Sequence, residues 1–365
     1  MKKVKIGNYV KQIRGVSYKT NDLHNDLNSD SVILLRANNI NEGKINFDDI
    51  VYVDKSKVKK EQYLKKGDIL VCASSGSKEL VGKAAFINKD YAVTFGAFCK
   101  LIRPKDCIAG YLGHYFNSQM YKEKISSLAL GANINNIRNE HIDELLIYLP
   151  NKAEQQNITI LLDEVSDLTD KRKKQLKKLD ELVKSRFIEM FGDPIKNTQH
   201  RPTTAFVNVV TMQRGFDLPV QDREQSGNIP VYGSNGVLDN HNQAKACNGG
   251  VITGRSGTIG KVFYTRGAYW PLNTTLFSVD THENNVIYLA HLLRMFNLAR
   301  FTEGTGVPTL NRNKFHSVPI IDVPIDEQNQ FATFVEQVDK SKFEIKQSLE
   351  KLELLKKALM QKYFG

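Results

Sequence analysis

An internal repeat constrains the fold of this 365-residue chain more than any other feature of its sequence. The run Leu-Lys-Lys-Leu-Asp-Glu-Leu at residues 176–182 returns as Leu-Glu-Lys-Leu-Glu-Leu-Leu at residues 349–355, an offset of 173. Phe191-Gly192 returns as Phe364-Gly365 at the same offset. A repeated order of motifs predicts a repeated structural unit. We therefore expect two copies of one architectural plan.

The repeat extends upstream, where the offset drifts as loop insertions require. Tyr-Leu-Gly-His at residues 111–114 matches Tyr-Leu-Ala-His at 288–291, and Arg14-Gly15 matches Arg214-Gly215. Ser75-Gly76, followed by Gly82-Lys83, matches Ser256-Gly257, followed by Gly260-Lys261. Each match is weak alone, but their shared order is specific.

The last part of each repeat has the pattern of a long helix. Phe331, Val338, Ile345, Leu352 and Leu359 follow a seven-residue spacing. Such a narrow apolar stripe is typical of a coiled-coil seam. The predicted seam consists of Ile158, Val165, Leu176, Leu179 and Val183 in the first helix, and of Phe331, Val338, Ile345, Leu352 and Leu359 in the second.

The first part of each repeat has mixed α and β character. Residues 68–72 and 250–253 are short apolar runs that lead to Gly/Ser-rich turns, as buried strands do, and residues 111–125 and 286–301 have helical spacing. The predicted fold class is α+β, with two globular domains joined by two long antiparallel coiled-coil helices in a pseudo-two-fold internal repeat. The predicted domains are residues 1–150 (first head), 151–192 (central helix), 193–202 (linker), 203–322 (second head) and 323–365 (C-terminal helix).

The order of these parts predicts how they assemble. The second helix must bury its seam, and the nearest seam of equal length is the first helix, so the two should run antiparallel. At ~1.5 Å per residue a helix of this length spans about 60 Å, which would hold one head near each end of a rod. The two heads differ in sequence, so two linked DNA half-targets would differ too. The alternative is that each seam binds a separate partner protein.

The charge of the chain favours a polyanionic partner. The net charge is +11, and residues 1–150 contain 23 Lys and Arg against 16 Asp and Glu. Residues 201–322 contain 11 against 8. Basic heads are typical of proteins that contact phosphate, although charge also serves solubility.

We expect a cytoplasmic protein. No apolar run is long enough for a signal peptide or a membrane span. The four cysteines, Cys72, Cys99, Cys107 and Cys247, form no CxxC pair and are expected to be reduced thiols.

Side-chain chemistry suggests which residues contact DNA. Arg and Lys can bind guanine edges or phosphates, and Asn and Gln can bind adenine edges. The candidates in the first head are Arg14, Lys19, Arg36, Asn38, Asn39, Ser75, Lys78, Lys83 and Arg138. Those in the second head are Arg214, Tyr232, Ser234, Asn235, Arg255, Ser256, Thr258, Lys261 and Arg312. Residues 131–136 and 304–306 are further glycine-containing loops that face DNA or serve as tight connections.

The enzymatic motifs that such a chain would need are missing. The Pro-Pro dipeptide of amino-methyltransferases does not occur. Gly76 to Lys83 and Gly254 to Lys261 approach the P-loop pattern, but each has one residue too many and no following Ser or Thr. These turns suit phosphate contact or a purely structural role. We expect His114 and His291 to be packed or capping residues, and we expect no catalytic, cofactor or metal site in this chain.

The chain resembles the specificity subunits of type I restriction–modification enzymes. The resemblance covers two globular parts each followed by a long helix, a proline followed by Glu154-Gln155 or Glu327-Gln328 before each helix, and Leu-x-x-Leu-x-x-Leu near each helix end. The run Gly-Asn-Ile-Pro-Val-Tyr-Gly at residues 227–233 is also similar to the family's recognition domains.

The resemblance implies a non-catalytic subunit that reads a split, asymmetric target with an unspecified spacer. Its partners would be double-stranded DNA, two modification subunits that methylate adenine N6 with S-adenosylmethionine, and restriction subunits that use ATP and Mg. A specificity subunit of a related type II system fits the same pattern. A coiled-coil protein whose heads bind protein or sugar is the alternative from another functional class.

Overall fold

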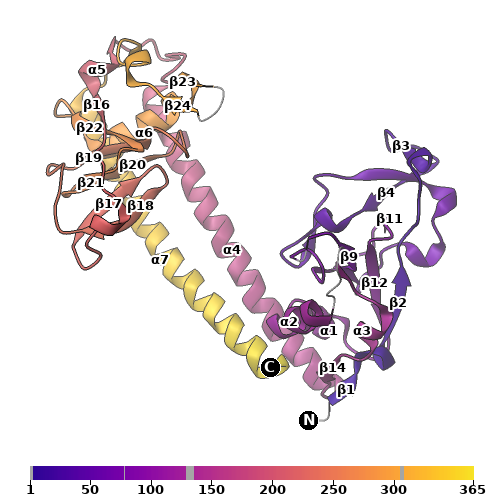
Figure 1. Ribbon diagram of the computed structural model, residues 1–365. Helices are drawn as coiled ribbons and strands as arrows, with labels where there is room; N and C mark the ends of the chain where they lie inside the picture. Colours follow the sequence, from indigo (N-terminus) through magenta and orange to yellow (C-terminus); the bar gives the residue numbers. More distant parts are fainter. Residues whose placement is uncertain (1–2, 78, 129–134, 305–307) are drawn as a thin grey trace. The chain divides into compact units, whose positions relative to one another are not determined.

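The computed structural model describes residues 3–77, 79–128, 135–304 and 308–365 and divides into two compact units. Unit 1 consists of residues 1–171 with residues 349–365, and unit 2 of residues 172–348. We call the part of unit 1 that precedes the first long helix head 1, and the part of unit 2 between the two long helices head 2 (Figure 1).

Head 1 is built on two four-stranded sheets. The first is antiparallel and has the order β10 (Ala84–Phe86), β8 (Ile69–Cys72), β12 (Cys99–Pro104) and β2 (Val10–Arg14). The second has the order β11 (Val93–Phe95), β4 (Ser31–Leu35), β7 (Val51–Asp54) and β3 (Leu23–His24), with β11 and β4 parallel. All four residues of β8 are buried, as its uninterrupted apolar run predicts.

Short pairs of strands and three helices complete head 1. The pairs are β1 (Lys3–Lys5) with β14 (Leu146–Tyr148), β5 (Ile40–Asn41) with β6 (Lys44–Ile45), and β9 (Ser74–Ser75) with β13 (Asn135–Asn136). The helices are α1 (Ala109–Phe116), α2 (Gln119–Leu128) and α3 (Asn139–Asp143). The helical spacing predicted over residues 111–125 is thus divided between α1 and α2.

Head 2 repeats this plan. Its antiparallel sheet has the order β16 (Thr211–Arg214), β22 (Thr275–Asp280), β19 (Gly250–Gly254) and β20 (Val262–Thr265). Its second sheet has the order β18 (Gly236–His241), β17 (Ile229–Gly233) and β21 (Trp270–Pro271). α6 (Val286–Phe296) is capped by the Asn285 side chain, which accepts from the Ile287 amide at 2.9 Å. The shorter elements of head 2 include α5 (Phe206–Val209) and two strand pairs. These are β15 (Thr203–Ala205) with β25 (Pro319–Ile321), and β23 (Thr302–Glu303) with β24 (Thr309–Leu310).

The same set of backbone hydrogen bonds holds one turn in both heads. In head 1 the amides of Ala73 and Ser74 donate to the Phe98 carbonyl, and the Ile137 amide donates to the Ala73 carbonyl. In head 2 the amides of Arg255 and Ser256 donate to the Thr274 carbonyl, and the Leu310 amide donates to the Arg255 carbonyl. We call this arrangement the backbone frame. It aligns Ser256 with Ser74, one residue before the Ser75 match that the sequence suggested.

The repeated Arg-Gly dipeptides have a packing explanation in this frame. A Cβ placed on Gly15 would lie 2.1 Å from the Gly96 carbonyl oxygen, and one placed on Gly215 would lie 2.2 Å from the Leu272 carbonyl oxygen. Only glycine allows the strand to approach the turn this closely. The repeat therefore keeps a glycine at each of these positions.

The two long helices are α4 (Lys152–Phe191) and α7 (Ile325–Phe364), of 40 residues each. Each has, in its first turn, a glutamine that is almost wholly buried. The Gln155 Oε1 accepts from the Ile108 amide at 2.9 Å, and the Gln328 Oε1 accepts from the Asn285 amide at 2.9 Å. The repeated glutamine thus ties the first turn of each long helix to the start of a helix in its own head.

Each long helix ends in the core of the other repeat's head. In unit 1, Phe364 of α7 packs against Tyr111 of α1, with ring centroids 5.0 Å apart. In unit 2, Phe191 of α4 packs against Tyr288 of α6, with ring centroids 5.2 Å apart. Within each unit the beginning of one helix therefore meets the end of the other, which fixes their antiparallel direction. The predicted α+β fold class is confirmed.

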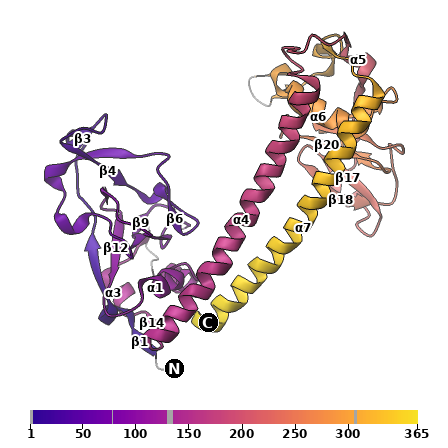
Figure 2. The same ribbon diagram turned by 180° about the vertical axis from the view of Figure 1, so that it is seen from behind.

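The seam residues lie on the inner sides of the helices. Ile158, Val165, Val183, Phe331 and Val338 are buried, and Leu176, Leu179, Ile345, Leu352 and Leu359 are half-buried. Lys342, at a polar break in the stripe, pairs with Asp180 of α4 at 2.7 Å. In Figure 2 the head-2 end of both helices lies against α6, where Phe187, Phe331 and Leu292 share one apolar cluster.

Candidate nucleic-acid interface

Three of the predicted DNA-binding arginines in head 2 line one hollow of about 360 Å³. Arg214 ends β16, Arg255 follows β19, and Arg312 begins a 3-10 turn at residues 312–314. The antiparallel sheet and the backbone frame bring these residues together from three separate parts of the sequence. The same hollow is lined by Asn311 and Asn313, which carry amide groups suited to base edges.

The charge of this hollow is predominantly positive. Glu303 is the acidic residue in its lining. The Lys314 Nζ lies 3.0 Å from the Glu303 carboxyl and holds the pKa of that carboxyl below its usual range. Arg214 lies 3.9 Å from Asp217, a distance typical of a weak, exposed pair. Three guanidinium groups beside one carboxylate can bind a phosphate or the acceptor edge of a guanine.

A second group of predicted residues in head 2 gathers at the β17–β18 turn. Ser234 and Asn235 form its two-residue loop, and the Lys261 Nζ donates to the Asn235 Oδ1 at 2.6 Å. Thr258 and Ser256 belong to the neighbouring turn, and Ser256 pairs with Thr309. Tyr232 is buried, and its ring packs against Tyr269 at 5.8 Å. Tyr232 is therefore a packing residue of this hairpin.

In head 1 the backbone frame joins the segments of two exposed arginines to the same turn. Arg14 ends β2 beside the close approach of Gly15 to Gly96, and Arg138 directly follows Ile137. Both side chains are exposed, whereas Ser75 and Lys83 are half-buried. Lys78, residues 131–134 of the predicted glycine loop and residues 305–306 of the corresponding loop in head 2 lie outside the described residues.

Three predicted residues of head 1 are engaged within their own turn. Arg36 pairs with Asp49 at 2.8 Å, and the Asn38 amide also donates to Asp49. Asn39 is wholly buried, accepts from the Arg36 amide at 2.8 Å and donates to the Asp49 carbonyl at 3.2 Å. Asn39 therefore fixes the backbone of this turn and does not face solvent.

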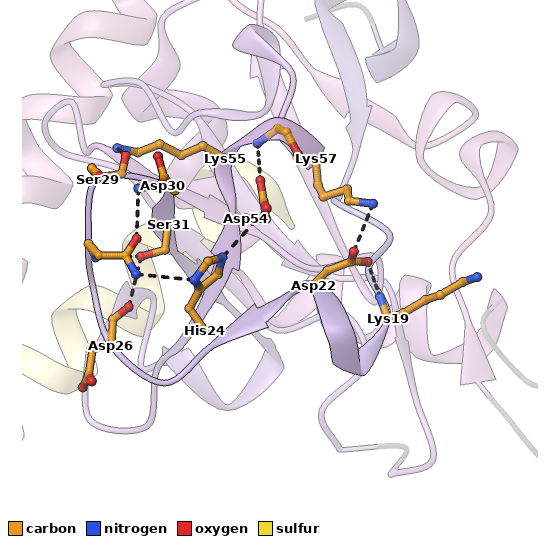
Figure 3. A network of polar contacts seen from close by, with 12 residues as sticks. Lys19, Asp22, His24, Asp26, Ser29, Asp30, Ser31, Asp54, Lys55 and Lys57 are labelled. Carbon is orange, nitrogen blue, oxygen red and sulfur yellow. Dashed lines mark hydrogen bonds and ion pairs between the residues drawn. The ribbon is translucent and has the colours of Figure 1, made fainter.

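Lys19 lies at the edge of a network of alternating charges (Figure 3). Its backbone amide donates to Asp22 at 2.8 Å, and Lys57 pairs with the same carboxylate at 3.0 Å. Both interactions lower the pKa of Asp22, the Lys19 amide having the larger effect. In Figure 3 the Lys19 side chain points away from Asp22, so its ammonium group is presented outward.

Lys100 of β12 is a further candidate residue that is absent from the set predicted from the sequence. This lysine is buried and donates from its Nζ to the Asn139 Oδ1 at 2.7 Å and to the Ile137 carbonyl at 3.3 Å. Burial lowers its pKa to about 8. The frame aligns Lys100 with Leu276, which lines the arginine hollow of head 2, so head 1 carries a cation at the equivalent position. The signal in the sequence is a lysine between Cys99 and Leu101 in the apolar first part of this strand.

The two histidines of the repeat are packed beside the long helices. The His114 Nε2 lies 2.8 Å from Asp163 of α4, and the His291 ring packs against Phe331 at 5.4 Å. Burial lowers the pKa of His291 to about 3, assisted by Arg294. Within the described ranges, no group of His, Cys, Asp or Glu side chains is arranged to hold a metal ion.

The P-loop-like glycine turns lead into strands. Lys83 is followed by β10 and Lys261 by β20, whereas a nucleotide-binding loop leads into a helix whose N-terminal amides face the phosphates. These turns therefore lack the helix that a phosphate loop needs. Among the helices of the described residues, none is both long and apolar enough to cross a membrane.

The chain matches the family described as type I restriction modification DNA specificity domain over residues 1–180 and 208–356. It is 41% identical over 173 residues to the EcoKI specificity subunit of Escherichia coli (strain K12), covering 47% of this chain and 37% of that protein. The same identity and coverage hold for the StySPI specificity subunit of Salmonella potsdam. The chain thus matches little more than a third of the length of these curated relatives.

Two solved structures share the fold over the whole chain. The S subunit of a type I restriction–modification system from M. genitalium is 16% identical, with a TM-score of 0.66 and coverage of 100% of this chain and 96% of that one. A chain from a study of complex assembly and conformational transition in the type I R-M system is 14% identical, with a TM-score of 0.58 and coverage of 100% and 97%. At these identities the likeness concerns the fold.

Proposed function

The chain belongs to the family of type I restriction–modification DNA specificity domains, and from that premise we propose that it is the non-catalytic DNA-reading subunit of such a system. Each head reads one half of a split, asymmetric target. The two long helices set the length of the spacer between the half-targets and bind the modification subunits that methylate the DNA. We place this activity in the cytoplasm, where the host DNA is accessible.

The convergence of Arg214, Arg255 and Arg312 in one hollow is the observation that carries this proposal. Guanidinium groups are the side chains best suited to bidentate contact with phosphates and guanine edges. The backbone frame presents different residues in the two heads, with Ala73 at the position of Arg255. One scaffold with two different surfaces suits the reading of two different half-targets.

The partners that we propose are two modification subunits and, where the system cleaves DNA, restriction subunits. Leu182 and Leu355 occupy equivalent places in the repeat and are 47% and 46% exposed on the long helices. Two equivalent apolar positions suit two copies of one partner. S-adenosylmethionine, ATP and Mg would be held by these partners, because the motifs for them are missing from the sequence of this chain.

The deciding experiment maps modified bases in the host genome with and without the gene for this chain. We expect a split, asymmetric adenine-methylation motif that disappears on deletion and returns on complementation. The complex of this chain with its modification subunit should bind that motif, with an affinity that falls steeply as the salt concentration rises. Methylation of DNA by this chain alone, or an unchanged methylation map after deletion, would contradict the proposal.

A further inference from the structure

Phe98 of head 1 exposes a large apolar side chain at a sharply defined place in the backbone frame. The residue is 68% exposed, which exceeds the exposure of the other large apolar residues described in unit 1, such as Leu354 at 67% and Leu27 at 58%. Isolated exposed apolar side chains are common on protein surfaces, so the exposure by itself indicates nothing. The position of this ring is what distinguishes it.

The backbone beneath the ring is fixed by several hydrogen bonds. The Phe98 carbonyl accepts from the Ala73 amide at 2.9 Å and from the Ser74 amide at 3.0 Å. The Cys99 amide donates to the Gly96 carbonyl at 2.8 Å, which closes the turn. The main chain that carries the ring is therefore already fixed. When the ring binds a partner, only the side chain loses conformational entropy.

Two exposed arginines belong to segments that the frame joins to this turn. Arg14 lies beside the turn, because Gly15 packs directly on Gly96. Arg138 directly follows Ile137, whose amide donates to the Ala73 carbonyl. An exposed apolar ring and two exposed guanidinium groups on one backbone frame match the chemistry of a duplex groove, where phosphates lie on both sides of the base edges.

The equivalent position in head 2 is occupied by Thr274. The Arg255 amide donates to the Thr274 carbonyl at 2.8 Å and the Ser256 amide donates to it at 3.2 Å, so the frame around it is the same as that around Phe98. Arg255 lines the arginine hollow, which places Thr274 next to the proposed recognition surface of its own head. The frame is thus constant while the residue that it presents changes from aromatic to small and polar.

We propose that Phe98 is a specificity-determining residue of head 1, and that its ring makes an apolar contact with a base edge of the half-target read by this head. The inference rests on the proposed function of DNA reading. Arg14 and Arg138 hold the phosphates on either side, and the ring contacts a base, as aromatic side chains contact the methyl group of thymine. Thr274 makes the corresponding contact in head 2 with a different base requirement.

The test uses the complex of the full chain with its modification subunit and the target defined by the methylation map. Binding is measured for the cognate duplex and for duplexes with each base pair changed singly. For Phe98→Ala we expect a loss of about 5- to 100-fold on the cognate duplex, with relaxed discrimination at one position of one half-target. The salt dependence should remain unchanged, since no charge is removed.

Three further variants separate base reading from other effects. Phe47→Ala removes another exposed phenylalanine of head 1, which is 40% exposed and packs against Tyr91, and it should leave discrimination unchanged. Phe98→Leu keeps an apolar side chain and should retain part of the cognate affinity. Thr274→Ala should alter discrimination only in the other half-target.

Two results would overturn the inference while the proposed function stands. One is wild-type discrimination by Phe98→Ala at every position, and the other is an equal loss of affinity on all duplexes. If the wild-type complex showed no preference among the duplexes, the proposed function itself would be wrong. The two failures are therefore distinguishable in one set of measurements.

Discussion

At the residue scale, the candidate interface depends on side chains that are distant in sequence. Arg214, Arg255 and Arg312 line one hollow because a sheet and a backbone frame bring their main chains together. Their separate contributions need not be equal, since a residue that contacts a base changes discrimination, whereas one that contacts a phosphate changes affinity on all sequences.

Arg214→Ala should weaken DNA binding by the complex without unfolding the chain, because this side chain is exposed and only loosely paired with Asp217. We expect a loss of about 5- to 100-fold on the cognate duplex if the guanidinium binds a base, and a reduction of the salt slope by about one if it binds a phosphate. Arg266→Ala, which removes an exposed arginine paired with Glu336, is the control and should change neither quantity. An unchanged affinity for Arg214→Ala would remove it from the interface.

Lys100 should make the stability of head 1 depend on pH in the alkaline range. Its folded-state pKa is lowered by burial from 10.5 to about 8, so the unfolded chain holds the proton more tightly between these values. The contribution of Lys100 to stability is therefore present above about pH 10.5 and is lost as the pH falls through about 8.

Between pH 8 and pH 10 the wild-type protein should therefore gain stability relative to Lys100→Met. The difference between their free energies of unfolding should rise by about 1–3 kcal/mol over this range. Denaturant titrations of both proteins across this range measure it. A difference that does not change with pH would show that Lys100 keeps an ordinary pKa in the folded chain.

At the element scale, each long helix is joined to its head by a buried glutamine. The Gln155 Nε2 donates to the Pro150 carbonyl at 2.7 Å, and its Oε1 accepts from the Ile108 amide. Gln328 makes the same pair of interactions with Val323 and Asn285. Both glutamines satisfy main-chain groups that the folded chain removes from water.

Gln155→Ala should destabilise the chain by about 2–4 kcal/mol, because it leaves a buried amide and a buried carbonyl without partners. Gln156→Ala changes the exposed neighbouring residue on the same helix and should cost less than about 0.5 kcal/mol. Guanidinium unfolding midpoints give both values. Equal midpoints for the two variants would mean that the buried glutamine is dispensable.

The sequence predicted the elements better than it predicted the interface. The repeat and the heptad spacing led to two long helices and two mixed α/β heads, because these patterns reflect burial directly. The side-chain environment of single polar residues depends on tertiary contacts. Asn39 resembled a base-reading residue, but its hydrogen bond to the Asp49 carbonyl holds it within the fold. Lys100 gave no sign of its partners, because Asn139 and Ile137 come close to it only through the tertiary fold.

At the scale of the whole molecule, the two repeats exchange their helix ends. Phe364, at the far end of the chain, is 2% exposed and completes the core of head 1 between Tyr111 and Tyr115. Phe191 does the same for head 2. Unit 1 therefore contains residues from both ends of the chain, and its stability depends on both repeats.

Phe364→Ala should lower the stability of unit 1 by about 2–4 kcal/mol and raise amide exchange in α1, although the substitution is more than 200 residues away in sequence. Exchange in β19 of head 2 should remain close to wild type. Phe343→Ala, on the same helix but 60% exposed, is the matched control and should leave both regions unchanged. Equal exchange in α1 for both variants would show that Phe364 is not part of this core.

The backbone frame has a consequence for how such a protein acquires new targets. The bonds that hold it join peptide groups, so they are indifferent to which side chain occupies positions 98 or 274. Substitutions at these positions can therefore alter which bases are recognised while changing the free energy of unfolding only slightly. Because each head has its own frame, the half-target of one head can change during evolution while the half-target of the other head stays the same.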